Sequence, residues 1–147
     1  MQPMIEGPWP TIVIEVGNSQ SILSLLSIRD RALSYLTQIN VVILVSYNRN
    51  VTRQADTWWI HIAARDIFAP QPPPGAPITY PNCSVLYDLP KGANSVDIPL
   101  AGNPIWSIPT WLFYWPEPVP IYDPPLPRTF DISLERIRET IRRERPN

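Results

Sequence analysis

The sequence of 147 residues is short of the features that define several protein classes. It holds one cysteine, Cys83, so no disulfide can form within the chain, which excludes a disulfide-stapled secreted scaffold. The longest aliphatic run, Val41 to Val45, is far too short to cross a bilayer. Met1 is not followed by the basic and apolar regions of a signal peptide. These absences predict an intracellular protein, cytoplasmic or nuclear, that does not enter a membrane.

An excess of charge of either sign is also missing. The formal net charge is −1 and the sequence pI is about 5.8, so the chain has no global basic surface for nucleic acid. A zinc site is not expected, because the chain offers one histidine, His61, and one cysteine, with a proline-rich stretch between them. A nucleophile pair of Cys83 and His61 would require the two side chains to be adjacent in space. We expect His61 to be a half-buried residue of a strand.

Proline is abundant where glycine is scarce, with 20 prolines against 5 glycines. A hydrophobic content of 44% and six tryptophans argue against a wholly disordered chain, so the prolines indicate stiff loops around a folded centre. The length suits a single domain over residues 1–147. Within it we expect a proline-rich loop at 69–82 and a Pro/Trp-rich segment at 104–127, where proline forbids a long helix and disfavours a central strand.

The pattern of apolar residues predicts an α/β (α+β) fold with a mixed central sheet. Its core is a βαβ unit, in which two β-prone runs flank an amphipathic helix with short connections. The β-prone run from Ile12 to Val16 is of the kind found in sheet strands that other elements cover on both faces. The expected elements are a strand at 11–16, a helix at 22–37 capped by Ser19 or Ser21, a strand at 41–46, further strands near 57–63 and 84–87, and a C-terminal helix at 132–143.

Glu15 places a carboxylate inside the first apolar strand. An ionised carboxylate there costs several kcal/mol unless it is paired, hydrogen-bonded, metal-bound or open to a cleft. Arg29 falls in the middle of the apolar face of the following helix and is the obvious ion-pair partner. The alternative is a metal ligand at the mouth of the sheet, although a hard divalent cation is normally held by more than one carboxylate. The structural interpretation is favoured, and both stay open at this point.

Three segments resemble the PD-(D/E)XK restriction-endonuclease-like superfamily. They are Pro10 to Ser21, which reads Pro-Thr-Ile-Val-Ile-Glu-Val-Gly-Asn-Ser-Gln-Ser, the helical Arg29-Asp30-Arg31-Ala32, and the strand Val41 to Val45. The likeness is to uncharacterised fungal proteins and to bacterial proteins assigned as restriction endonucleases, and it covers about the first third of the chain. It implies a mixed central sheet flanked by helices, with metal-dependent hydrolysis of phosphodiesters.

The resemblance implies a role for four residues. Glu15 matches the glutamate of the E-x-K motif and would hold Mg²⁺, whereas Gly17 stands where the lysine should be. Some branches carry that lysine on the following helix, where Arg29 or Arg31 lies here, and Gln20 is another polar substitute. An arginine can hold a phosphate but does not readily deprotonate a water.

The first aspartate of the family has no counterpart, because the sole carboxylate before Glu15 is Glu6, on a segment flanked by glycine and proline. The resemblance therefore implies a nuclease-like domain that is catalytically impaired or inactive. If activity survives, it is that of a Mg²⁺-dependent phosphodiesterase.

The alternative function is a non-enzymatic protein-interaction module that uses the Pro/Trp-rich half. The densest aromatic cluster of the chain lies there, and Pro70–Pro73 and Pro124–Pro127 match the loose P-x-x-P pattern. A nucleic-acid partner is not supported by the net charge. The arginines of the last segment do not require one either, because a solvated helix with alternating ion pairs explains them. The aromatic cluster comprises Trp106, Trp111, Phe113, Tyr114 and Trp115.

Overall fold

The computed structural model describes residues 11–18, 21–34, 37–48, 56–67, 83–89 and 94–144. The proline-rich loop expected at 69–82 lies outside these residues, as does Gln20. Within the described part of the chain, no helix is long and apolar enough to cross a membrane.

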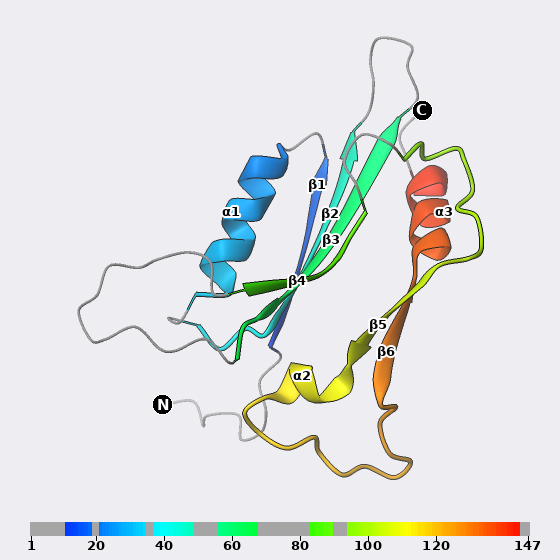
Figure 1. Ribbon diagram of the computed structural model, residues 1–147. Coiled ribbons are helices and arrows are strands. Elements are labelled where there is room, and N and C mark those ends of the chain that lie inside the picture. The colour runs from blue at the N-terminus through cyan, green and yellow to red at the C-terminus, as the bar shows by residue number, and fades with distance from the viewer. Residues whose placement is uncertain are drawn as a thin grey trace, which may run out of the picture.

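A four-stranded mixed sheet lies at the centre of the molecule and confirms the expected fold class (Figure 1). The strand order is β1-β2-β3-β4, with β1 parallel to β2 and the other neighbours antiparallel. The βαβ core is therefore present. The strands are β1 (Ile12–Asn18), β2 (Val41–Asn48), β3 (Thr57–Arg65) and β4 (Cys83–Asp88).

Two further layers cover the sheet (Figure 1). Helix α1 (Ile22–Ala32) packs on one face, where Leu25 meets Val42 and Leu44. A small second sheet and two helices pack on the other face, where the side chains of Val41, Ile43 and Val45 are buried. This second layer consists of β5 (Ile105–Pro109), α2 (Thr110–Tyr114), β6 (Thr129–Ser133) and α3 (Leu134–Glu144). Strand β2 is buried on both faces, which explains its unbroken aliphatic sequence.

Helix α1 begins where the sequence predicts and ends earlier. The Ser21 hydroxyl accepts a hydrogen bond of 3.1 Å from the Ser24 amide, which is a standard N-cap. The helix ends at Ala32 rather than near residue 37. Arg65, the last residue of β3, stabilises the non-helical connection that follows Ala32. Its guanidinium donates to carbonyl oxygens of this connection, among them those of Ser34 at 2.8 Å and Ile39 at 2.7 Å. Burial lowers the pKa of Arg65 from its ordinary value.

The second layer is tied to the sheet by a buried asparagine. Asn40 is 1% exposed, and its side-chain amide donates to the carbonyl oxygens of Leu112 at 2.9 Å and Trp115 at 2.6 Å. These two carbonyls lie at the end of α2, where a helix leaves such groups without partners of its own. Asn40 therefore holds α2 against the start of β2.

Helix α3 contains a buried cation that the sequence pattern did not predict. Arg138 is 1% exposed, and its Nε donates to both carboxylate oxygens of Glu135 at 2.9 and 3.0 Å. Its Nη1 donates to the Val96 carbonyl at 2.6 Å, and the Leu100 amide donates to Glu135 at 2.8 Å. The expectation of a solvated charged helix is thus wrong at Arg138, which fastens the segment 94–100 to α3.

Candidate functional site

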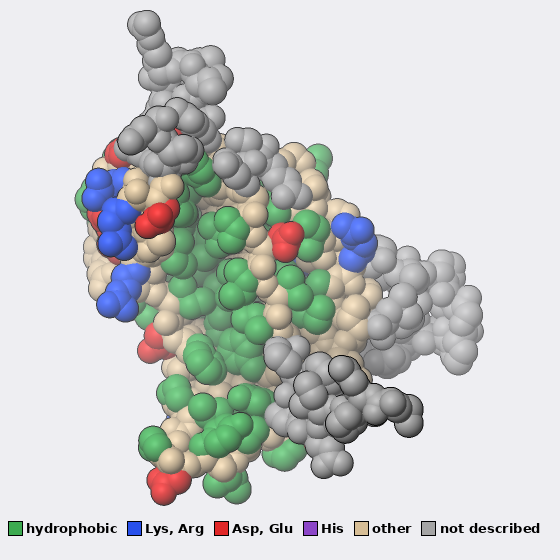
Figure 2. All heavy atoms as spheres, turned by 180° about the vertical axis from the view of Figure 1, so that it is seen from behind, with side chains coloured by type: hydrophobic (Ala, Val, Ile, Leu, Met, Phe, Trp, Pro, Cys, Tyr) green, Lys and Arg blue, Asp and Glu red, His purple; other side chains and the backbone are tan. Residues whose placement is uncertain are grey.

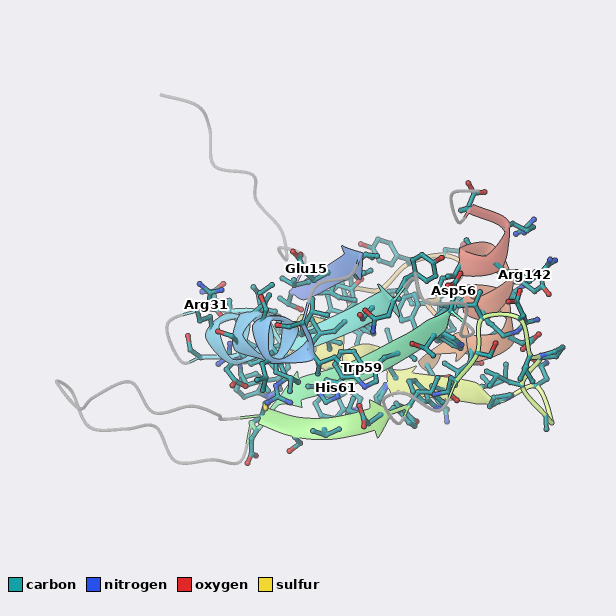
Figure 3. The ribbon with its side chains drawn as sticks, turned by 90° about the horizontal axis from the view of Figure 1, so that it is seen from above. Glu15, Arg31, Asp56, Trp59, His61 and Arg142 are labelled. Carbon is teal, nitrogen blue, oxygen red and sulfur yellow. The ribbon has the colours of Figure 1, made fainter. Side chains whose placement is uncertain are left out.

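Four residues of neighbouring strands form a row across the sheet face that α1 covers. Glu15 on β1 is in register with Leu44 on β2, Leu44 with His61 on β3, and His61 with Asp88 on β4. Neighbouring strands are about 4.8 Å apart, so Glu15 and His61 are separated by about 10 Å, with β2 between them (Figure 3).

Both ring nitrogens of His61 form hydrogen bonds. The Nη1 atom of Arg29 lies 3.0 Å from His61 Nε2, and His61 Nδ1 lies 2.8 Å from Asp88 Oδ1. A guanidinium can only donate, so Nε2 accepts and Nδ1–H donates to the carboxylate. Trp59 completes the cluster, because its Nε1–H donates to Asp88 Oδ1 at 3.0 Å and its ring stacks on His61 at 5.3 Å.

Arg29 therefore does not neutralise Glu15. Its guanidinium forms an ion pair with Asp30 at 2.9 Å and a hydrogen bond with His61. The expected pairing is wrong because the helix directs Arg29 over β3 rather than over β1. Among the described residues, no hydrogen bond or ion pair involves the Glu15 carboxylate.

The residues that the resemblance singles out are not brought together. Glu15 is half-buried on β1, Arg29 is hydrogen-bonded to His61, and Arg31 is exposed on α1 (Figure 3). Within the described ranges, no three His, Cys, Asp or Glu side chains are grouped so as to hold a metal ion. The assignment of Glu15 as a Mg²⁺ ligand stays a prediction that depends on the resemblance.

Cys83 does not form a nucleophile pair with His61, since both ring nitrogens of His61 are bound to Arg29 and Asp88. Cys83 is half-buried, and burial raises the pKa of its thiol, with Arg29 opposing the effect and the carboxylates of Asp30 and Asp66 adding to it. A raised pKa leaves less thiolate at neutral pH. The polar cluster is best explained as a connection between α1 and the strands β3 and β4.

The opposite face of the sheet carries a groove between β1 and the second layer. It encloses about 520 Å³, and its floor and walls are mostly hydrophobic. Figure 2 shows this side of the molecule from behind, with a band of hydrophobic side chains running down it. The groove is lined by Thr11, Ile12, Ile14, Ile43, Ile108, Phe113, Tyr114, Phe130, Asp131 and Ile132.

The groove exists because β1 is an edge strand of the sheet. The second layer covers β2 and β3 and leaves Ile14 59% and Val16 68% exposed. The expectation that β1 is covered on both faces is therefore wrong. Large apolar side chains exposed next to one another mark interaction sites in soluble proteins.

One carboxylate lies at the rim of the groove. Asp131 accepts hydrogen bonds from the hydroxyls of Ser107 at 2.7 Å and Thr129 at 2.9 Å, and these bonds lower the pKa of Asp131. Asp131 is consequently ionised at neutral pH. Sequence reasoning missed the groove, because its two walls come from segments about 100 residues apart that nothing in the sequence pairs.

No family model, no curated protein and no solved structure matches this chain.

Proposed function

We propose that this chain is a protein-binding module whose groove between β1 and the second layer takes a segment of polypeptide. The observation that carries the proposal is the apolar groove of about 520 Å³ beside exposed Ile14 and Val16. The Pro/Trp-rich half supplies Phe113 and Tyr114 to one wall, in keeping with the interaction function expected from the sequence.

The polar groups of the lining favour a polypeptide over a small molecule. Small-molecule sites present a few convergent polar groups that fix the ligand. Here the Thr11 hydroxyl donates to the Phe113 carbonyl, and one oxygen of Asp131 accepts from both Ser107 and Thr129, so few polar groups are left to converge on a ligand. The rest of the lining is mostly apolar surface next to the backbone of an edge strand, which suits an extended peptide.

Selection from a phage library of random twelve-residue peptides tests this proposal. We expect the selected peptides to bind Ile14→Glu about 10–100-fold more weakly than the wild type, because the contact that buries Ile14 is lost. Val85→Glu is the matched control, since Val85 is 52% exposed on β4 at the opposite edge of the sheet. Peptides that bind Ile14→Glu as well as wild type, or no selection at all, would contradict the proposal.

A nuclease activity remains the second proposal. Two observations favour it. The β1–α1–β2 segment resembles the PD-(D/E)XK superfamily, and the Glu15 carboxylate has no ion-pair or hydrogen-bond partner among the described residues. Mg²⁺ bound at Glu15 would supply charge stabilisation. Arg31 is the arginine proposed to hold a phosphate, since Arg29 is already bound to Asp30 and His61, and Gln20 is the other polar substitute for the missing lysine.

Cleavage of DNA with Mg²⁺ or Mn²⁺ by the wild type and Glu15→Gln tests this second proposal. Activity that is lost in Glu15→Gln and kept in Glu117→Gln, an exposed glutamate far along the chain, is the supporting result. Equal activity in all three proteins, or none in any, removes it.

A further inference from the structure

The outer edge of β1 has backbone groups that the sheet does not use. β1 is the first strand in the order β1-β2-β3-β4, and within the described residues it pairs with β2 alone. In such a strand, alternate residues direct their N–H and C=O groups away from the neighbour. A row of free donors and acceptors of this kind pairs readily with another extended chain.

The two faces of β1 differ in a way that would select the side chains of such a chain. Ile12 and Ile14 line the groove, and Val16 continues their face. Glu15 lies on the opposite face, toward α1, and Figure 3 places it at the outer side of the sheet. A strand added at this edge alternates in the same way, with every second side chain on the groove side.

We propose that the occupant of the groove is an extended segment of another protein that adds to the sheet as a strand beside β1, with apolar side chains in the groove and a basic side chain next to Glu15. This inference rests on the proposed protein-binding function and adds the backbone geometry and the charge of the partner.

Charge complementarity supports a basic partner. Among the described residues, the Glu15 carboxylate has no partner, and the charged side chain that lines the groove is the carboxylate of Asp131. An arginine or lysine directly across from Glu15 forms a favourable cross-strand pair, whereas an acidic residue there is destabilising.

The same charge argues against a second copy of this chain at the edge. Glu15 is the central residue of β1 (Ile12–Asn18), so a two-fold antiparallel pairing of two β1 strands along their full length sets two Glu15 carboxylates opposite each other. Like charges in that position are destabilising. A charged residue on an edge strand is a common device against such self-association.

Fluorescence anisotropy with designed nine-residue peptides tests the inference. The probe alternates valine and arginine, and the comparison peptide carries glutamate in place of arginine. Two further versions of the probe carry N-methyl groups on alternate amides, one version for each edge of the peptide. We expect the arginine peptide to bind about tenfold more tightly than the glutamate peptide, and one N-methyl version to lose binding while the other retains it.

The protein variants separate charge from backbone pairing. Glu15→Gln should weaken the arginine peptide about fivefold, and Glu144→Gln, an exposed glutamate at the end of α3, should leave its affinity unchanged. Equal affinity of wild type and Glu15→Gln overturns the charge assignment, and equal binding of both N-methyl versions overturns strand addition.

The outcomes also distinguish this inference from the proposed function. If phage selection yields peptides that require Ile14 while strand addition fails, the binding module stands and its partner is not a strand. If neither experiment shows binding, both fall. Sedimentation that shows a wild-type dimer which Ile14→Glu dissociates assigns the edge to a second copy and overturns the inference.

Discussion

Arg138→Ala is expected to lower the free energy of unfolding by about 3 kcal/mol, at the low end of the range for breaking a buried ion pair, because its carboxylate partners are partly exposed. The substitution removes a guanidinium that is 1% exposed and leaves the Val96 carbonyl without its donor. Urea denaturation followed by tryptophan fluorescence measures the change.

Arg142→Ala on the same helix is the matched control. The Arg142 side chain is 43% exposed and pairs with Glu139 at 3.0 Å, and exposed pairs of this kind contribute less than about 1 kcal/mol. An equal loss of stability in the two variants would show that the burial of Arg138 adds nothing to the free energy of unfolding.

The pH dependence of Arg138→Ala gives a second readout of the same contact. The hydrogen bond from Arg138 lowers the pKa of Glu135 from its ordinary value of 4.5. A carboxylate with a lowered pKa in the folded state stabilises the protein above its unfolded pKa, and this stabilisation is lost as the pH falls through the folded pKa. Wild type should therefore lose stability below about pH 4.5 more steeply than Arg138→Ala does. Parallel curves would contradict this assignment.

Asn40→Asp is expected to cost about 4 kcal/mol, and Asn40→Ala about 2 kcal/mol. The alanine variant leaves the carbonyls of Leu112 and Trp115 without a donor, whereas the aspartate variant also sets a buried carboxylate against them. Because α2 carries Phe113 and Tyr114 into the groove wall, both variants should weaken peptide binding as well.

Thermal unfolding of the two Asn40 variants and of Asn103→Asp measures this effect. Asn103 is exposed, directly after a turn, with φ of 45°, a conformation that aspartate also tolerates, so its substitution should change stability by less than about 0.5 kcal/mol. If Asn40→Asp is as stable as wild type, Asn40 does not hold α2 to the sheet.

The central sheet could be predicted from the sequence because its signals are local. The aliphatic run from Val41 to Val45 and the β-prone run near 57–63 are properties of single strands, and the Ser21 cap lies next to the helix it begins. The structural features that sequence reasoning missed depend on residues far apart in the chain. The end of α1 at Ala32 is stabilised by Arg65, and β5 pairs with β6 across a proline-rich connection.

The candidate site shows the same limit. Glu15 stands out in the sequence as a carboxylate among aliphatic residues, but the ion pair with Arg29 that this pattern suggests does not form. Its surroundings could not be read, because they depend on β1 lying at the edge of the sheet and on the direction of Arg29 over β3. The groove could not be predicted without knowing that the segment 104–133 folds back beside β1.

Amide hydrogen exchange by NMR, with and without the valine–arginine peptide, tests most directly whether β1 is a polypeptide-binding edge. Binding should slow exchange at alternate amides of Ile12–Asn18, those that face away from β2, and leave the amides of β4 at the other edge unchanged. Exchange in β1 that is the same with and without the peptide, or protection confined to residues around His61 and Asp88, would contradict the proposed edge.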